Sequence, residues 1–156
     1  MNTRNRGFRN GVRAGVAGLA LIAASGIAHA QTAEQAIAFR KGVMQVQQWH
    51  LTPLVQMVKN ARPYDAALVA RNAAILEASS RMTVEGFVAG TETGNTRALP
   101  AVWKDAAGLK TANERFQAEA AKLVAAAKGG DEKVVRAQIG EVLRSCVGCH
   151  ENFRAK

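Results

Sequence analysis

The spacing of apolar and polar residues predicts helices along most of the chain. From residue 32 onward, apolar side chains recur every three or four positions, which is the period of a helix with one buried face. No stretch alternates with the period of two that a half-buried strand shows. Turn-forming residues divide this pattern into four predicted helices, over 32–58, 66–87, 101–128 and 131–154.

Capping residues mark the ends of these predicted helices. Thr32 opens a capping box, in which two side chains each accept a hydrogen bond from the other residue's backbone. Asp65 and Asp131 are suitable N-caps for the second and fourth helices, and Pro100 suits the first turn of the third. Pro53 lies inside the first helix and should kink or restart it, because proline lacks a backbone N–H.

The connections between the helices predict how they are arranged. One connection is long, polar and rich in glycine, at 90–96, and the other two are short. Short connections favour antiparallel neighbours. Aromatic residues make up only 5% of the chain and alanine is abundant, which argues against an all-β fold. We therefore predict an all-α fold, an antiparallel up-down-up-down four-helix bundle in one domain.

The first thirty residues have a separate character. Four arginines precede an apolar run over 14–27, and Ala28-His29-Ala30 then gives the small-x-small pattern of a cleavage site. We expect a signal peptide over 1–30 and a mature domain over 31–156. The apolar run is about 14 residues, against about 20 needed to span a bilayer, so we expect export to the periplasm without stable membrane insertion. An uncleaved anchor is the alternative.

The net charge of +9 does not indicate a nucleic-acid partner. Four of the basic residues belong to the predicted signal peptide, and the others are scattered among twelve acidic residues. The chain has no basic cluster interleaved with aromatic residues, which is the pattern that tracks a phosphate backbone.

The strongest chemical motif is Cys146-Val147-Gly148-Cys149-His150, because Cys-x-x-Cys-His is the attachment sequence of haem c. Residues three apart share one helix face, so both thiols can reach the two vinyl groups on one edge of the porphyrin. His150 follows as an axial ligand of the iron. We predict one covalently bound haem c per chain. No methionine follows His150, so any sixth ligand must come from upstream.

Other interpretations of the two cysteines are weaker. A thiol–disulfide protein without haem would need the pair at the start of a helix that follows a strand. A zinc site needs four ligands, and the only other histidine after the signal peptide is His50. We expect His50 to be a partly buried histidine with a hydrogen-bonded ring. The thiol–disulfide protein remains a remote alternative.

The chain resembles the class II c-type cytochromes, which comprise cytochromes c' and their low-spin relatives. The resemblance covers nearly all of 31–156. It is carried by Phe39-Arg40-x-x-x-Met44 with His50, by Pro63-Tyr64-Asp65, by Gly90-Thr91-Glu92 with Trp103, and by residues 146–154. Members of this family are known four-helix bundles, so the resemblance and the helix pattern are not independent predictions of the bundle architecture.

The resemblance implies roles for individual residues. Arg40 matches an arginine that pairs with a haem propionate, and Thr91 and Glu92 match a loop segment near the propionate edge. Arg154 would lie one turn beyond the proximal histidine. Met44 matches the distal position, where some members carry a methionine that binds the iron and others a side chain that only packs above it. Met44 is therefore either an iron ligand or a core methionine.

The remaining candidates have simpler explanations. Met57 follows Pro53 and lies several turns from Met44, which makes it a poorer ligand candidate, and we expect Met82 to belong to the core. We expect Trp49 and Trp103 to be packing residues in preference to electron relays. Phe87 either lines the distal pocket or fills core.

Two functions follow from the haem. No catalytic constellation accompanies it, so we do not expect an enzyme. The leading hypothesis is a periplasmic protein that carries single electrons between redox partner proteins, with His150 as the proximal ligand and Met44 at the distal position. The alternative is a five-coordinate haem that binds nitric oxide or carbon monoxide, with Met44 and Phe87 excluding larger ligands. The resemblance also suggests a homodimer through the first and second helices.

Overall fold

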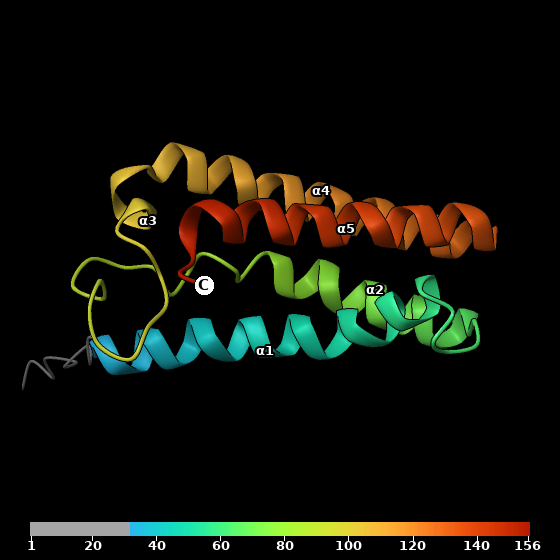
Figure 1. Ribbon diagram of the computed structural model, residues 1–156, viewed down its shortest axis with the longest axis horizontal. Coiled ribbons are helices and arrows are strands. Elements are labelled where there is room, and N and C mark those ends of the chain that lie inside the picture. Colours follow the sequence, from blue (N-terminus) through green and yellow to red (C-terminus); the bar gives the residue numbers. More distant parts are fainter. Residues whose placement is uncertain (1–31) are drawn as a thin grey trace, which may run out of the picture. The chain divides into compact units, whose positions relative to one another are not determined.

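The computed structural model describes residues 32–156, and its long helices run side by side as a bundle (Figure 1). The helices are α1 (Ala33–Val58), α2 (Ala66–Ser80), α3 (Ala101–Lys104), α4 (Ala106–Gly129) and α5 (Glu132–Phe153). The predicted all-α, up-down-up-down four-helix bundle is confirmed, with α3 as an additional single turn. The predicted signal peptide over 1–30 lies outside the described residues.

The predicted helix starts are formed by the expected side chains. The Thr32 hydroxyl accepts from the Gln35 backbone at 3.2 Å, and the Gln35 side chain accepts from the Thr32 backbone at 2.9 Å. The Asp65 side chain caps α2 by accepting from the Leu68 backbone, and the Asp131 side chain caps α5 by accepting from the Lys133 and Val134 backbones. The predicted restart at Pro53 is not observed, because α1 continues through it as one helix of 26 residues.

The predicted end of the second helix is wrong. α2 ends at Ser80 instead of residue 87, and residues 81–86 form turns. The Ser80 hydroxyl donates to the Glu77 carbonyl at 2.6 Å, a contact that competes with the backbone ladder. Gly86 then lies directly against α1, since a Cβ built there would come within 2.8 Å of the Ala36 carbonyl and of the Arg40 Cβ. A straight helix would not bring the chain into that contact.

The predicted third helix is broken near its start. Asp105 has a non-helical backbone (φ −122°, ψ 64°) and separates α3 from α4. Its side chain accepts a hydrogen bond from the Gly108 backbone at 2.9 Å, so it is the N-cap of α4.

The apolar core fills the half of the bundle that contains the end of α1 and the start of α5. The buried residues that contribute most volume are Leu54, Met57, Leu76, Leu123 and Ile139. In residues 32–156, no helix is both long enough and apolar enough to cross a membrane.

The methionines and tryptophans outside the predicted haem site differ in how far their side chains are exposed. Met57 is fully buried in the apolar core. Met82 is 38% exposed and Trp49 is 77% exposed, so the predictions for these two residues are wrong. Trp103 does pack, with its ring edge-on to Phe87 at a centroid distance of 6.2 Å.

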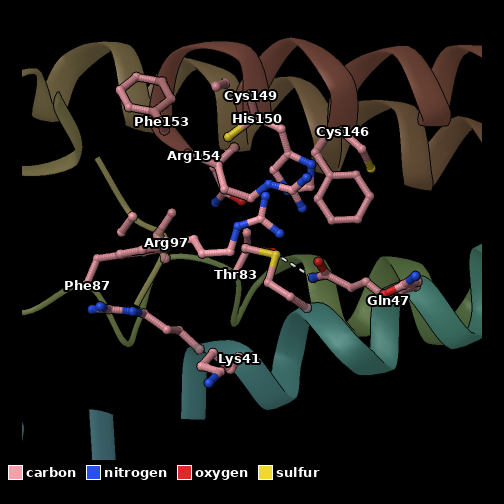
Figure 2. A pocket seen from close by; sticks show the side chains of 18 of the residues that line it. Lys41, Gln47, Thr83, Phe87, Arg97, Cys146, Cys149, His150, Phe153 and Arg154 are labelled. Carbon is pink, nitrogen blue, oxygen red and sulfur yellow. Dashed lines mark hydrogen bonds between the residues drawn. The ribbon is translucent and has the colours of Figure 1, made fainter. Parts of the chain in front are cut away.

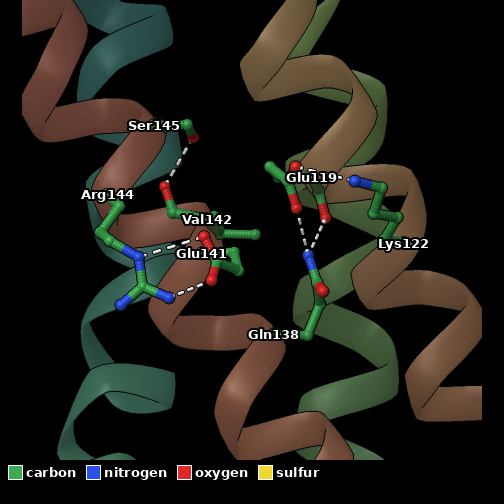
Figure 3. Close-up of polar contacts among 7 residues, drawn as sticks. All are labelled: Glu119, Lys122, Gln138, Glu141, Val142, Arg144 and Ser145. Atoms are coloured by element: carbon green, nitrogen blue, oxygen red, sulfur yellow. Dashed lines mark hydrogen bonds and ion pairs between the residues drawn. The ribbon is translucent and has the colours of Figure 1, made fainter.

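A polar contact connects α4 to α5 (Figure 3). The Glu119 carboxylate accepts hydrogen bonds from Lys122 at 2.9 Å and from Gln138 at 2.7 Å. The hydrogen bond from Lys122, followed by the one from Gln138, lowers the pKa of the Glu119 carboxyl. A carboxyl whose pKa is lowered by folding stabilises the folded state above its unfolded pKa. That contribution is lost as the pH falls through the folded pKa.

We expect Glu119→Gln to lower the free energy of unfolding by about 0.5–1 kcal/mol at pH 7. The loss is small because the charged partner, Lys122, is 62% exposed and its ion pair is screened by solvent. At pH 3 the loss should be smaller still, since the Glu119 carboxyl of the wild type is then partly protonated. Denaturant unfolding at the two pH values measures the difference. Glu114→Gln is the control for an ion pair near solvent, since Glu114 pairs with Lys110 and the two side chains are 55% and 72% exposed. An equal loss for Glu119→Gln at both pH values would contradict the prediction.

Candidate functional site

A cavity of about 560 Å³ occupies the other half of the bundle, a size typical of ligand sites. It is lined by α1, α2, α4 and α5 and by the connection between α2 and α3. Leu51, Leu76 and Phe116 belong both to its wall and to the apolar core, so the cavity continues the core. Figure 2 shows His150 on the α5 side and Lys41 and Gln47 on the α1 side.

The two cysteines line this cavity from one helix. Cys146 and Cys149 are free thiols on α5, and both are partly buried. Burial raises the pKa of Cys146 to about 11 and also raises that of Cys149. Thiol–disulfide enzymes depend on a thiolate with a lowered pKa, so these groups have the opposite character. The site does not support the remote alternative of a thiol–disulfide protein.

His150 lines the cavity next to the cysteines. Burial lowers the pKa of its imidazole, and the nearby charges of Arg154 and Arg97 lower it further. A neutral imidazole has the free nitrogen lone pair that a metal needs. His50 is not in this cavity and its ring is within 2.9 Å of the Asn72 side chain, which matches the expectation of a hydrogen-bonded histidine.

Met44 and Phe87 also line the cavity, whereas the two other described methionines, Met57 and Met82, do not. Met44 follows Arg40 by one turn on α1, on the wall that faces α5. Among residues 32–156, Met44 is therefore the only thioether in the wall.

Arg40 is held by the long connection. Its side chain is buried and donates to the Gly86 carbonyl at 3.1 Å, to the Thr91 hydroxyl and carbonyl at 2.7 and 2.8 Å, and to the Thr96 hydroxyl at 2.7 Å. Its guanidinium carbon also lies 5.0 Å from the Phe87 ring centroid. Burial lowers the pKa of Arg40, and the charge of Glu92 opposes that effect.

The structure does not bring Thr91 or Glu92 to the cavity wall. Thr91 is buried behind Arg40, and the Glu92 carboxylate accepts from the Gly90 backbone at 3.2 Å. The connection reaches the cavity through Asn95 and Thr96 instead.

The sequence analysis missed two features of the site. Gln47 is buried in the wall and donates to the Thr83 hydroxyl at 2.8 Å, which ties α1 to the segment after α2 (Figure 2). Arg97 lines the cavity because its segment pairs with the C-terminal residues, where Ala98 and Arg154 form an antiparallel bridge. The sequence gives one weak signal for Arg97, which is a basic residue inside a polar connection.

The residues of this site fit a haem c. Cys146, Cys149 and His150 open on the same cavity, in agreement with the spacing of the attachment motif. The side-chain oxygen of Asn113 in the wall is buried and lacks a hydrogen-bond partner in the described structure, which suits a wall completed by a bound group. Residues 32–156 contain no cluster of three or more His, Cys, Asp or Glu side chains that would hold a metal unaided.

Fold and site together define a c-type haem protein built on a helical bundle. The family model described as Cytochrome C' matches residues 35–154. The cytochrome c' of Rubrivivax gelatinosus is 38% identical over 122 residues, which is 78% of this chain and 95% of that protein. The chain belongs to the cytochrome c' family, and it carries one covalently bound haem c.

Solved structures agree with this assignment. The crystal structure of the Rubrivivax gelatinosus protein matches with a TM-score of 0.76, covering 80% of this chain and 98% of that one. Cytochrome c prime from Shewanella frigidimarina has a TM-score of 0.78 at 30% identity, and the match covers 81% of this chain and 99% of that one. A variant of the protein from Alcaligenes xylosoxidans has a TM-score of 0.74 at 36% identity, and the match covers 80% of this chain and 98% of that one.

Proposed function

We propose that this protein binds nitric oxide or carbon monoxide at a five-coordinate haem iron held by His150. The haem, held by Cys146, Cys149 and His150, would supply an iron that can bind a small diatomic ligand. The likeness to cytochromes c' carries the proposal, and the cavity wall on the α1 side agrees with it, because the described residues of that wall include no histidine or cysteine that could bind the iron opposite His150. Met44 and Phe87 narrow the space and thereby exclude larger ligands.

Relatives support this choice over the electron-transfer hypothesis. Variants of the Alcaligenes xylosoxidans protein have been solved as a nitric oxide complex and with carbon monoxide bound. Single-electron transfer between redox partner proteins is the second candidate, because the Met44 thioether lines the cavity and is a possible sixth ligand. In either case the protein acts as a haem carrier, not as an enzyme.

The visible spectrum of the purified protein tests the proposal. We expect high-spin spectra in both oxidation states and formation of complexes when carbon monoxide or nitric oxide is added to the ferrous protein. A low-spin ferric spectrum with a weak sulfur-to-iron band in the far red would instead indicate Met44 ligation and favour electron transfer.

We also infer that the protein works in the periplasm after removal of residues 1–30. The inference rests on the basic start, the short apolar run and Ala28-His29-Ala30, together with a haem attachment that takes place outside the bacterial cytoplasm. The mature chain would begin near residue 31.

A homodimer through α1 and α2 is the third part of the proposal. Phe39, Val46 and Trp49 follow each other on α1 at spacings of seven and three, which places them on one face, and they are 40%, 43% and 77% exposed. An exposed tryptophan beside other apolar side chains is typical of a contact surface.

We expect the wild-type protein to be a dimer at micromolar concentration and Trp49→Glu to be a monomer, because the glutamate would place a charge in the contact. Sedimentation velocity measures both. Val134→Glu is a matched control on α5, since Val134 is 52% exposed. A wild-type protein that is monomeric across this range would remove the claim.

A further inference from the structure

Two buried polar side chains meet in the cavity wall on the α1 side. Gln47 lies on α1, three residues after Met44 and therefore on the same helix face, and Thr83 lies in the turns that follow α2. Both residues line the cavity, and each is 7% exposed. Figure 2 shows the hydrogen bond that joins them, whereas His150 lies on the α5 side. Buried polar groups are costly unless they are hydrogen-bonded, so the partners of this pair are informative.

The Ser79 carbonyl fixes the orientation of the Gln47 amide. A carbonyl oxygen can only accept, so the amide nitrogen must face it, at 3.1 Å. The same nitrogen donates its second N–H to the Thr83 hydroxyl at 2.8 Å. Both N–H groups of the amide are therefore used, and the Thr83 oxygen is the acceptor in this contact.

The Thr83 hydroxyl keeps its own hydrogen, because a hydroxyl that accepts one hydrogen bond can still donate another. Two neighbouring hydroxyls donate to backbone carbonyls, Ser79 to Leu76 at 3.2 Å and Ser80 to Glu77 at 2.6 Å. Within residues 32–156, the Thr83 hydroxyl only accepts, from Gln47. A buried donor without an acceptor is costly, so a group bound in the cavity is a suitable partner for Thr83.

A diatomic gas bound at the iron opposite His150 can accept this hydrogen bond. Ferrous iron donates electron density to bound nitric oxide, which leaves partial negative charge on the outer oxygen. Carbon monoxide gains less of this charge and is a weaker acceptor. Hydrogen-bond donors in the pocket of a haem protein therefore change its preference among small ligands.

We propose that the Thr83 hydroxyl donates a hydrogen bond to nitric oxide bound in the cavity and thereby favours nitric oxide over carbon monoxide. Gln47 is the positioning residue, since its amide occupies the Thr83 oxygen and turns the hydroxyl hydrogen away from α1. The inference rests on the proposed function, because it needs a diatomic ligand on the α1 side of the cavity.

The first test is infrared spectroscopy of the ferrous holoprotein with carbon monoxide bound. A donor near bound carbon monoxide lowers its stretching frequency. Thr83→Val keeps the side-chain shape and removes the hydroxyl, so it should raise the frequency, whereas Thr83→Ser keeps the donor and should stay close to the wild type. Gln47→Met should raise the frequency by less, because the freed Thr83 hydroxyl can then turn toward the Ser79 carbonyl.

Dissociation of nitric oxide from the ferrous holoprotein is the second test, with carbon monoxide as the trap for the emptied iron. We expect dissociation about 2- to 10-fold faster in Thr83→Val than in the wild type, the factor that corresponds to one ordinary hydrogen bond. Thr52→Val is the matched control, since Thr52 is an exposed residue of α1 outside this cavity and its hydroxyl donates to the Gln48 carbonyl at 2.7 Å.

Three results would overturn the inference while leaving the proposed function intact. The first is a Thr83→Val protein with the stretching frequency and dissociation rate of Thr52→Val. The second is an equal change in Thr83→Ser, which keeps the donor. The third is a change in Asn113→Leu that Thr83→Val does not show, because the donor would then be the Asn113 amide, which lines the cavity from α4.

Failure of the proposed function gives a different result, a wild-type ferrous protein that binds neither gas. That result would also remove the inference about Thr83. If Thr83→Val yields too little holoprotein, Thr83→Ala is compared with Thr83→Ser by the same two measurements, and equal frequencies and rates in these two variants would overturn the inference.

Discussion

Carbon monoxide should bind the ferrous Met44→Ala protein roughly 10- to 100-fold faster than the wild type. Met44 stands in the cavity wall on the α1 side, so a ligand entering there must fit against its side chain. Crowding of a packed site costs about 1–3 kcal/mol, and relief of that cost in the transition state corresponds to the stated factor in rate. Flash photolysis or stopped-flow mixing of the reduced protein measures the rate.

Met44→Leu separates crowding from ligation. Leucine and methionine have similar volumes, and such exchanges usually cost less than about 1.5 kcal/mol in stability. If Met44 only crowds the ligand, the leucine variant should bind carbon monoxide at nearly the wild-type rate and keep the high-spin spectrum. If Met44 binds the iron, the same variant should change from low-spin to high-spin, bind carbon monoxide faster and have a lower reduction potential.

Two other methionines provide controls. Met57→Leu changes the apolar core and Met82→Leu changes a partly exposed turn, and neither residue lines the cavity. We expect both variants to keep the wild-type spectrum and carbon monoxide rate. A rate in Met44→Ala that equals these controls would show that Met44 does not limit access to the iron.

Helix starts and the haem motif could be predicted because their determinants are local in the sequence. An N-cap such as Asp65 or Asp131 needs only the backbone of the next few residues. Cys146, Cys149 and His150 belong to one short stretch of helix, so their spacing alone places them at one cavity.

The errors arose where distant segments meet. α2 ends early in a region where Gly86 packs against α1, a contact between residues that are about fifty positions apart in the sequence. The position of Arg97 depends on pairing with the last residues of the chain, and no local pattern encodes that pairing. Trp49 was expected to be a packing residue, but its position on the outer face of α1 leaves it exposed.

Among the polar contacts of residues 32–156, the one between Arg40 and the 86–96 connection should cost the most stability when it is removed. Arg40→Met keeps much of the side-chain volume and removes the donors, which leaves the buried Thr91 hydroxyl and the carbonyls of Gly86 and Thr91 without their present partner. Hydrogen bonds to a charged group contribute about 1.5–3 kcal/mol each before partial compensation by water. We expect the free energy of unfolding to fall by about 3 kcal/mol and the connection to become accessible to protease.

Gly86→Ala tests the contact between Arg40 and the connection by a change in the connection. An added Cβ would lie 2.8 Å from backbone and side-chain atoms of α1, so the segment must move away and weaken the hydrogen bond between Arg40 and the Gly86 carbonyl. We expect a loss of about 1–3 kcal/mol. Denaturant unfolding and limited proteolysis measure both variants against Gly129→Ala, where nothing lies within 4 Å of the added Cβ.

Arg40→Lys completes this series, because it separates charge from geometry. Lysine keeps the positive charge but lacks the planar fork that reaches three acceptor residues at once, so it should behave more like Arg40→Met than like the wild type. If Arg40 serves the connection, these variants should lose stability while the bending vibration of the haem propionate groups, measured by resonance Raman spectroscopy on the folded holoprotein, stays unchanged. A vibration that shifts in Arg40→Lys without any loss of stability would instead place a propionate on Arg40, as the family resemblance implied.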